Sequence, residues 1–455
     1  MTDTTKHGER PLCPPAGSLP ASAWPQEAAF PEKPLNAWLP LRAQLLLVLG
    51  SYILGRLYLS LWVANTDWLC FGFTALFLAW GELALRLREQ YGAPRPDAAV
   101  RREALFWAFC TLAVGAALSL GRCGACAGWA LLFWHGFAVY WVLCRAGLLT
   151  QRSTGAAFLW DAANALLFLP FSGLFLRART LWAGIRCAAH RRRRPAGRQM
   201  GVTLLCLAAA LPFLLWAARL LAGADETFGL LVEACADLFR LDLSERVWYQ
   251  LRLLLWSLPA GAYFYGLVGG SARQISPRFE LADLQRESER LRVAPRAAAV
   301  LILAAFCGLY TVFFGVQAGY LFGGFGGILP AGFSPAQYAR QGFYELCCIL
   351  VMNFGLLTAC ARLSACPVRR SPAVRRLCIL LMAESLLFCG TVLAKIALYI
   401  SIFGFTPRRL LAGWAVIVFA AAAVLAISTL VRPHPAIRKL VWFAAASFVV
   451  LCFLY

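Results

Sequence analysis

The sequence predicts an all-α protein: a polytopic helical membrane bundle of about eleven transmembrane helices (roughly 10 to 12), plus interfacial amphipathic helices. Its 455 residues are 61% hydrophobic and only 14% charged, whereas a soluble domain is roughly 45–50% apolar and about 25% charged. About 20 apolar residues are enough for a helix to cross the hydrocarbon layer, and segments of that length recur along nearly the whole chain. This composition excludes an intrinsically disordered chain, a disulfide-linked secreted domain and a water-soluble α/β enzyme.

Residues 1–42 are polar and rich in proline, a composition that cannot bury enough apolar surface to fold. They lack the basic, apolar and small-residue order of a cleaved signal peptide. We expect a disordered cytoplasmic tail here, followed by a four-helix membrane segment at 43–149. An interfacial helix with an Arg-rich cytoplasmic loop is expected at 150–199, and a C-terminal membrane core at 200–455.

Eleven apolar segments have the length and hydropathy of transmembrane helices. They are 44–63, 68–87, 105–120, 128–149, 200–221, 247–269, 297–322, 343–361, 377–403, 410–431 and 440–455. A twelfth segment, 156–176, is long enough to cross but contains Asp161, Asn164 and Pro170. Hydropathy alone leaves open whether it crosses or lies in the interface.

The distribution of basic residues predicts whether the twelfth segment crosses the membrane, because cytoplasmic loops of membrane proteins carry an excess of Lys and Arg. With a cytoplasmic N-terminus and 156–176 lying flat, about three quarters of the 43 Lys and Arg residues fall on the cytoplasmic side. If 156–176 crosses, every later loop changes sides and the share falls to little more than a third. The charges therefore predict eleven transmembrane helices and a flat 156–176 segment.

Two further segments are amphipathic at the helical period of 100° per residue. In 228–240 the apolar residues gather on one face, which predicts an interfacial helix on the extracytoplasmic side. In 280–292 three leucines lie opposite charge pairs such as Asp283 and Arg286, which predicts a cytoplasmic helix, either packed on the bundle or solvated without a partner. The net charge of +21 is spread over short loops, so we expect it to reflect orientation and no binding of nucleic acid.

No arrangement of residues in the sequence points to a metal, a cofactor or catalysis. Cys123 and Cys126 form a C-x-x-C pair, but no second pair or His-x-x-x-His completes a zinc site. His135 stands alone in an aromatic segment and is expected to be a packed core residue. Because no paired carboxylates, H-E-x-x-H or Ser/His arrangement occurs, we expect no cofactor and favour a role other than that of an enzyme.

Two stretches in the last third of the chain carry a recognisable pattern. They are Y-L-F-G-G at 320–324 with Y-A-R-Q-G-F-Y-E-L at 338–346, and Y-I-S-I-F-G-F-T-P-R-R at 399–409. The chain thereby resembles the bacterial multi-pass inner-membrane family called domain of unknown function 4153/4173, whose members show Y-A-R-x-G-F-x-E-L and then Y-x-x-x-[YF]-G-[LF]-T-x-x-R. The likeness is expected over 200–455. It implies a multi-pass protein of the bacterial inner membrane and a set of candidate residues, but no reaction.

With eleven helices, both motifs and Asp225 emerge on the extracytoplasmic side, which predicts one polar site there. The candidate ligand-binding residues are Asp225, Tyr338, Arg340, Glu345, Lys395, Tyr399, Thr406 and Arg409. Guanidinium groups bind phosphate or carboxylate in bidentate fashion, which suits an anionic lipid headgroup or a lipid-linked precursor. The alternative is structural: Arg340 or Arg409 pairs with Glu345 or Asp225 and holds the loops together.

A polar stripe runs along the segment 377–403. Glu384, Thr391, Lys395 and Tyr399 follow one another at i, i+7, i+11 and i+15, which places them on one face of a helix. An unpaired ion in hydrocarbon costs about 2.5 kcal/mol or more, so we expect Glu384 and Lys395 to face the bundle interior or water. In the alternative, Lys395 reaches the outer headgroups and Glu384 the inner ones, and no cavity exists.

The favoured function is transport or translocation of a small or lipid-linked anionic ligand through the extracytoplasmic polar site, with the lipid bilayer as the main partner. The alternative is a membrane sensor or accessory subunit that signals to a separate cytoplasmic partner protein. A membrane-embedded transferase with Glu345 or Asp225 as base ranks last. A continuous hydrophilic cavity from Glu384 to Tyr399 would favour transport, whereas a dry core with a polar pocket at the outer face would favour sensing.

Overall fold

Helices make up the described part of the chain, with no β-strand among its residues, so the predicted all-α class is confirmed. The computed structural model describes residues 38–63, 67–191, 195–224, 229, 245–273, 281–323 and 343–454. Most of the expected tail at 1–42 and of the amphipathic segment 228–240 lies outside the described residues, as do the candidate residues Asp225, Tyr338 and Arg340.

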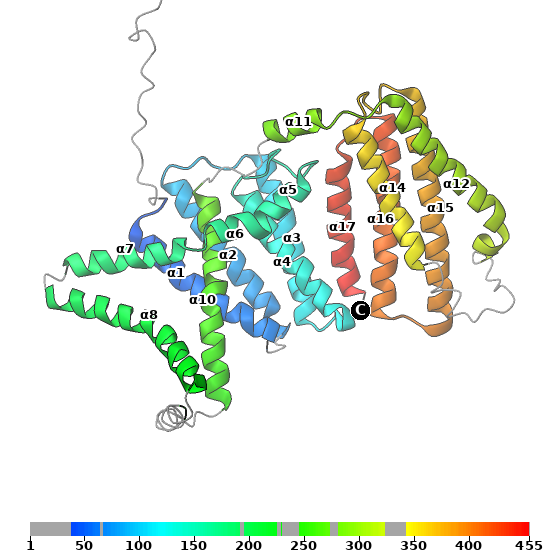
Figure 1. Ribbon diagram of the computed structural model, residues 1–455. Coiled ribbons are helices and arrows are strands. Elements are labelled where there is room, and N and C mark those ends of the chain that lie inside the picture. Colours follow the sequence, from blue (N-terminus) through cyan, green and yellow to red (C-terminus); the bar gives the residue numbers. More distant parts are fainter. Residues whose placement is uncertain are drawn as a thin grey trace, which may run out of the picture. The chain divides into compact units, whose positions relative to one another are not determined.

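The long helices follow one another along the chain (Figure 1). They are α1 (Leu41–Val63), α2 (Cys70–Gln90), α3 (Ala98–Ser119), α4 (Ala127–Arg145), α8 (Pro195–Ala224), α10 (Glu245–Ala272), α12 (Arg296–Gly323), α14 (Phe343–Leu363), α15 (Pro372–Phe403), α16 (Pro407–Val431) and α17 (Ala436–Phe453). The shorter pieces are α5 (Phe158–Ala163), the π-turn η3 (Asn164–Phe168), α6 (Leu169–Ser172), α7 (Leu176–Arg191), α11 (Leu281–Arg290) and the turn η2 (Gly124–Cys126). The predicted helix at 280–292 is thus present as α11, and it contacts α14.

Local sequence signals explain where these helices start. The carboxylate of Asp97 accepts a hydrogen bond from the Val100 amide at 2.8 Å and caps the first turn of α3. Ser371 caps α15 in the same way, and both α15 and α16 carry proline at the start of the helix, where its missing N–H and fixed φ are favourable. α15 ends at Gly404, whose φ of 75° suits glycine.

Eleven helices in the described residues have the length and composition needed to cross a membrane. Ten of them match the predicted segments. The eleventh differs: it is Phe158–Ala188, whereas in the expected segment 200–221 only Ala209–Leu221 is described as an apolar helix, and it is shorter. The reason is that the helical run that begins in 156–176 continues into α7, so that its length exceeds the segment read from the sequence.

Contacts between distant loops fix which helix ends share a side. Arg438, at the start of α17, forms an ion pair with Glu103, at the start of α3, at 2.8 Å. Between these two positions the chain must therefore cross an even number of times. If α3, α4, α10, α12, α14, α15 and α16 all cross, they supply an odd number, so among the described residues one further crossing is needed, by either 158–188 or α8.

The two segments differ in geometry, and that α8 crosses while 156–176 lies flat stays a prediction. α8 is one helix of 30 residues, long enough for a bilayer at 1.5 Å per residue. The 158–188 segment consists of α5, a π-turn, α6 and α7, with a turn at 173–175 before α7. α6 packs on α10, and α7 packs on α1 and α10.

Two sets of loops result. The α2–α3, α14–α15 and α16–α17 loops share one side, because Arg369 donates to the Thr429 carbonyl and Glu103 pairs with Arg438. We call this the Arg-rich side. On the opposite side the α3–α4 loop meets the start of α16, where a Cβ on Gly124 would lie 3.7 Å from Cγ of Pro407.

The helices pack into two cores. In the N-terminal half (α1–α4 and α10), α1 and α10 cross so closely that a Cβ on Gly55 would lie 2.5 Å from the Gly261 nitrogen, so only glycine fits. In the C-terminal bundle (α12, α14, α15 and α16), Leu303, Leu350 and Phe388 are fully buried, and α15 and α16 run side by side (Figure 1).

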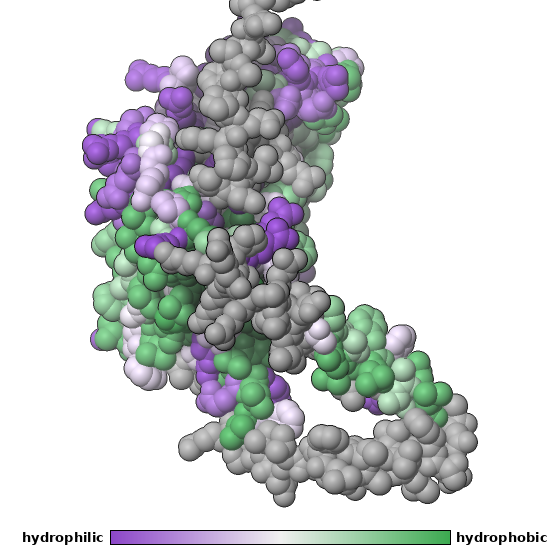
Figure 2. All heavy atoms as spheres, turned by 90° about the vertical axis from the view of Figure 1, so that its left-hand side faces the viewer, coloured by the Kyte–Doolittle hydropathy of each residue, from purple (hydrophilic) through white to green (hydrophobic). Residues whose placement is uncertain are grey.

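Large apolar side chains also cover the outside of the described helices. Leu46, Leu105 and Leu301 are each about 70% exposed, at 71%, 69% and 70%. Figure 2 shows hydrophilic residues gathered toward one end of the face in view, with hydrophobic residues over much of the surface beneath them. An apolar surface flanked by polar ends is what a lipid bilayer requires.

Candidate functional site

The end of α15 opposite the Arg-rich side brings two motif residues into contact. Nη1 of Arg409 donates hydrogen bonds to the carbonyls of Phe403 and Gly404 at 3.1 and 2.6 Å. Its guanidinium group lies 4.0 Å from the ring centroid of Tyr399. Arg409 thus holds the last carbonyls of α15, where a cation also stabilises the helix dipole.

These contacts revise the structural alternative for Arg409. Within the described residues it binds backbone carbonyls and the rings of Tyr399 and Phe403, and it forms no ion pair with Glu345. Arg409 does not reach Glu345, because the fold turns at Gly404 and brings the Arg409 side chain back onto α15. Asp225 and Arg340, the other possible members of such a bridge, lie outside the described residues.

Lys395 lies one turn of α15 before Tyr399 and is buried, at 2% exposure. Glu345, near the start of α14, is exposed and attracts Lys395 electrostatically. Thr406 precedes α16 and accepts the Arg409 and Leu410 amides through its carbonyl oxygen, without a side-chain capping bond. The described candidates therefore gather at the ends of α14, α15 and α16 on one side of the protein.

A second polar cluster lies deeper in the C-terminal bundle. Glu384 of α15 is 4% exposed, and its Oε1 accepts a hydrogen bond from Thr311 of α12 at 3.1 Å. Its Oε2 is buried without a hydrogen-bond partner among the described residues. Glu384 thus points into the bundle, so the alternative in which it reaches the inner headgroups does not describe this structure.

Next to Glu384 is a hydrogen-bonded chain across three helices. The Tyr310 hydroxyl of α12 donates to Oδ1 of Asn353 of α14 at 2.8 Å, and Nδ2 of Asn353 donates to Ser385 of α15 at 3.0 Å. Sequence reasoning identified Glu384 but missed Tyr310, Thr311 and Ser385. The available signal was that each is a hydroxyl residue inside an apolar segment, where it needs a partner on another helix.

The buried polar residues of α15 form the predicted stripe, but apolar residues separate them. Glu384, Thr391 and Lys395 are all buried, and the ends of the stripe are about 16 Å apart along the helix. Phe388 and Val392 lie between them at 0% exposure. Of the two pockets that stand out in the described residues, neither is lined by a residue of the stripe.

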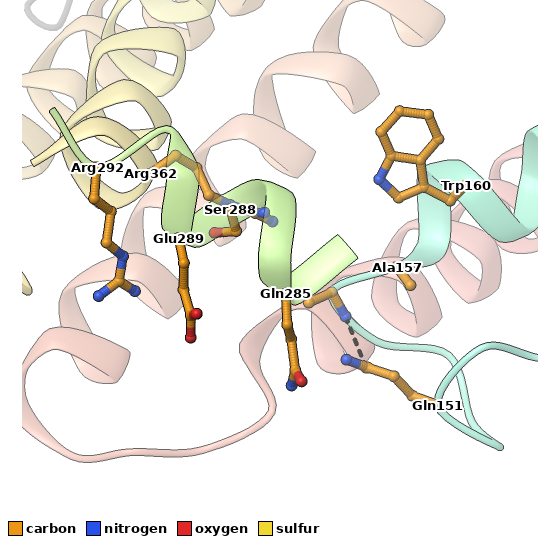
Figure 3. Close-up of a pocket in the computed structure, with 9 residues that line it drawn as sticks. Gln151, Ala157, Trp160, Gln285, Ser288, Glu289, Arg292 and Arg362 are labelled. Carbon is orange, nitrogen blue, oxygen red and sulfur yellow. Dashed lines mark hydrogen bonds between the residues drawn. The ribbon is translucent and has the colours of Figure 1, made fainter. Parts of the chain in front are cut away.

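One of these pockets, of about 410 Å³, lies on the Arg-rich side. It is bordered by the turn before α5, by α11 and by the end of α14 (Figure 3). Gln285, Glu289 and Arg292 project to the same side of the α11 segment, while Oε1 of Gln151 accepts the Ala156 amide at 3.2 Å. The pocket is thus polar and accessible from the side on which the sequence predicts the cytoplasm.

The C-x-x-C pair lies in η2, against the start of α16. The Cys123 thiol is hydrogen-bonded to Cys452 at the end of α17. Burial raises the pKa of the Cys126 thiol, and the neighbouring Cys123 adds to the rise, whereas Arg408 opposes it. A raised pKa disfavours the reactive thiolate, and no group of three His, Cys, Asp or Glu residues suited to a metal ion occurs in the described part of the chain.

His135 is packed in the N-terminal half between two tyrosines. Its Nδ1 lies 3.1 Å from the Tyr58 hydroxyl and its Nε2 lies 3.3 Å from the Tyr263 hydroxyl. Tyr263 in turn donates to the Leu166 carbonyl at 3.1 Å. This chain of hydrogen bonds joins α1, α4, α10 and the η3 turn, which fits a structural histidine.

Comparison with known families gives one match. A family model described as a domain of unknown function (DUF4153) matches residues 98–455. The match begins at α3 and is therefore longer than the expected 200–455, in keeping with the packing of α3 on α17. No curated protein and no solved structure is significantly similar to the chain.

Proposed function

We propose that this chain, which belongs to the DUF4153 family of unknown function, binds a small or lipid-linked anionic ligand and carries it across the bacterial inner membrane. The ligand enters at the end of α15 that carries Lys395, Tyr399 and Arg409. The Arg-rich side faces the cytoplasm, as does the N-terminus, because basic loops are retained there. The entry site is then extracytoplasmic.

The observation that carries the proposal is the burial of Lys395. Its side chain is 2% exposed, although a lysine this close to a helix end could extend to the headgroups at little cost. Its described electrostatic partner, Glu345, is itself exposed. A cation kept inside a bundle in this way is a common feature of substrate paths in membrane proteins.

Arg409 and the deeper cluster add to this support. Nη1 of Arg409 donates to the α15 carbonyls, and its other N–H groups form no hydrogen bond within the described part of the chain, so they suit an anion at the mouth. Beyond Lys395, the stripe continues to Glu384, whose carboxylate is hydrogen-bonded to Thr311 and Cys307 while its Oε2 has no partner among the described residues. The path needs Phe388 and Val392 to move, since both are fully packed here.

Translocation is tested in proteoliposomes with a fluorescent NBD-labelled phosphatidylglycerol, whose outer-leaflet label is destroyed by dithionite. We expect the wild-type chain to accelerate exchange of this lipid between leaflets. Lys395→Met should slow it roughly tenfold or more, the effect of about 1.4 kcal/mol, while the matched variant Lys439→Met, at an exposed position of α17, leaves it unchanged. Absence of exchange with the wild-type chain, or equal exchange with Lys395→Met, would overturn the proposal.

The second candidate function is that of a sensor or accessory subunit. The apolar packing between Glu384 and Lys395 and the polar pocket at α11 on the Arg-rich side favour it. In that case the same labelled lipid binds in a Lys395-dependent manner but does not change leaflet. A separate cytoplasmic partner would then dock at α11.

A further inference from the structure

A groove between α2 and α3, with α4 as its floor, opens near the Arg-rich ends of these helices. It encloses about 630 Å³. Its charged lining residues are Glu82, Arg86, Glu89, Arg95, Arg101 and Arg145. The groove shares no lining residue with the proposed entry site at the end of α15 and lies toward the opposite side of the protein.

The charges in the groove leave an excess of cations. Arg145, 11% exposed, contacts both carboxylates: its Nε lies 2.7 Å from Glu82 and its Nη1 lies 2.8 Å from Glu89. Arg86 also pairs with Glu82, at 2.7 Å. Both glutamates are therefore neutralised within the groove.

Two arginines at the rim have no carboxylate partner among the described residues. Arg95 and Arg101 are exposed, and Arg101 donates from Nε to the Pro96 carbonyl at 3.3 Å. The remaining N–H groups of these two arginines, together with those of Arg86, can donate hydrogen bonds to an anion. Guanidinium groups that line one groove suit a phosphate group.

The other end of the groove is apolar. Ala104 and Trp141 are 3% and 4% exposed, and Ala108 continues the same wall. A Cβ on Gly81 would lie 2.9 Å from the Trp141 ring. The glycine therefore allows the ring to pack directly against the backbone of α2 at the base of the groove. Leu105 at the edge is 69% exposed. Along α2 the apolar residues lie nearer the middle of the helix than the charged ones.

We propose that this groove binds an anionic phospholipid, with the phosphate held by Arg86, Arg95 and Arg101 and the start of an acyl chain lying along Ala104, Ala108 and Trp141. The charge excess selects an anionic headgroup over a zwitterionic one. Inorganic phosphate would make no use of the apolar half of the groove. A phospholipid would, because its acyl chain can lie along this half and continue into the hydrocarbon layer. The proposal does not depend on the function proposed above.

Photolabelling of the full chain in nanodiscs tests the site. The probe is phosphatidylglycerol with a diazirine in its acyl chain, and the comparison probe is phosphatidylcholine with the same chain. We expect label from phosphatidylglycerol on peptides of the groove wall, and far less from phosphatidylcholine. The double variant Arg95→Gln with Arg101→Gln should lower the apparent affinity for this lipid roughly 30-fold. This is the effect expected from the loss of two basic charges near a membrane surface.

The control is Arg370→Gln with Arg376→Gln, which removes the same charge from exposed positions of the Arg-rich side outside the groove. Ala108→Phe fills the apolar half without touching an arginine and should also abolish labelling. Equal labelling by the two lipids, or equal loss in the control and the groove variants, would overturn the proposal. Competition by inorganic phosphate would also overturn it, since the groove would then be a site for a soluble anion.

Discussion

The N-terminal half and the C-terminal bundle bury charged side chains among different partners. In the N-terminal half two sets of charges near helix ends form ion pairs: Arg145 binds Glu82 and Glu89, and Glu103 binds Arg438 of α17. In the C-terminal bundle Glu384 is held by a hydroxyl group, and Lys395 is buried near an exposed glutamate. Ion pairs between helix ends hold helices together, whereas charged side chains buried inside a membrane bundle often mark a functional path.

This comparison assumes that both regions share one set of membrane sides. The strongest test gives an all-or-none result. Single cysteines are placed at Pro94, Pro433 and Phe405 in a variant without exposed native cysteines. Each variant is then treated with a membrane-impermeant maleimide. Pro94→Cys and Pro433→Cys should react only after permeabilisation, and Phe405→Cys in intact cells, because the Glu103–Arg438 pair places the first two loops together. Reaction of positions 94 and 433 from opposite sides would contradict both this ion pair and the crossing number derived from it.

The second prediction concerns the paired ions. Glu103 is 1% exposed and accepts from Arg438, from Nε1 of Trp442 at 3.2 Å and from the Thr154 amide at 3.3 Å. Glu103→Ala leaves three donors unpaired, so the free energy of unfolding should fall by about 3 kcal/mol. Unfolding by SDS in mixed micelles measures this loss.

The matched control for that measurement is Glu287→Gln. Glu287 pairs with Arg290 on the surface of α11, where the two side chains are 63% and 77% exposed, so the loss should be below about 1 kcal/mol. A similar small loss for Glu103→Ala would mean that the ion pair between α3 and α17 does not hold α17 against the N-terminal half.

Much of the fold could be predicted from the sequence, because about 20 apolar residues identify a crossing helix without knowledge of its neighbours. The arginines also predict the side of each loop, since this rule acts on each loop separately, and that orientation stays a prediction. The segments 158–188 and 200–221 were harder, because hydropathy measures length and composition and ignores the turn at 173–175 that divides the first of them.

The site could be predicted only in part. Lys395 and Tyr399 were identified because their spacing on one helix is visible in the sequence. The partners Glu103 and Arg438 are 335 residues apart, and no local pattern reveals such a pair. Arg409 was read as a ligand or bridge residue, although the glycine at 404 already indicated a helix end whose carbonyls need a donor.

The smallest expected effect separates the two regions most sharply. Glu384→Gln keeps the size of the side chain and its bond from Thr311, but removes a charge whose Oε2 has no described partner. Because burying an uncompensated charge costs more than burying an amide, the variant should be as stable as the wild type or more stable by up to about 1 kcal/mol. The same micelle unfolding, run beside Glu103→Gln, measures the difference in sign. If Glu384→Gln destabilises the chain as strongly as Glu103→Gln, then Glu384 is a paired structural ion. The polar stripe of α15 would then not support a ligand path.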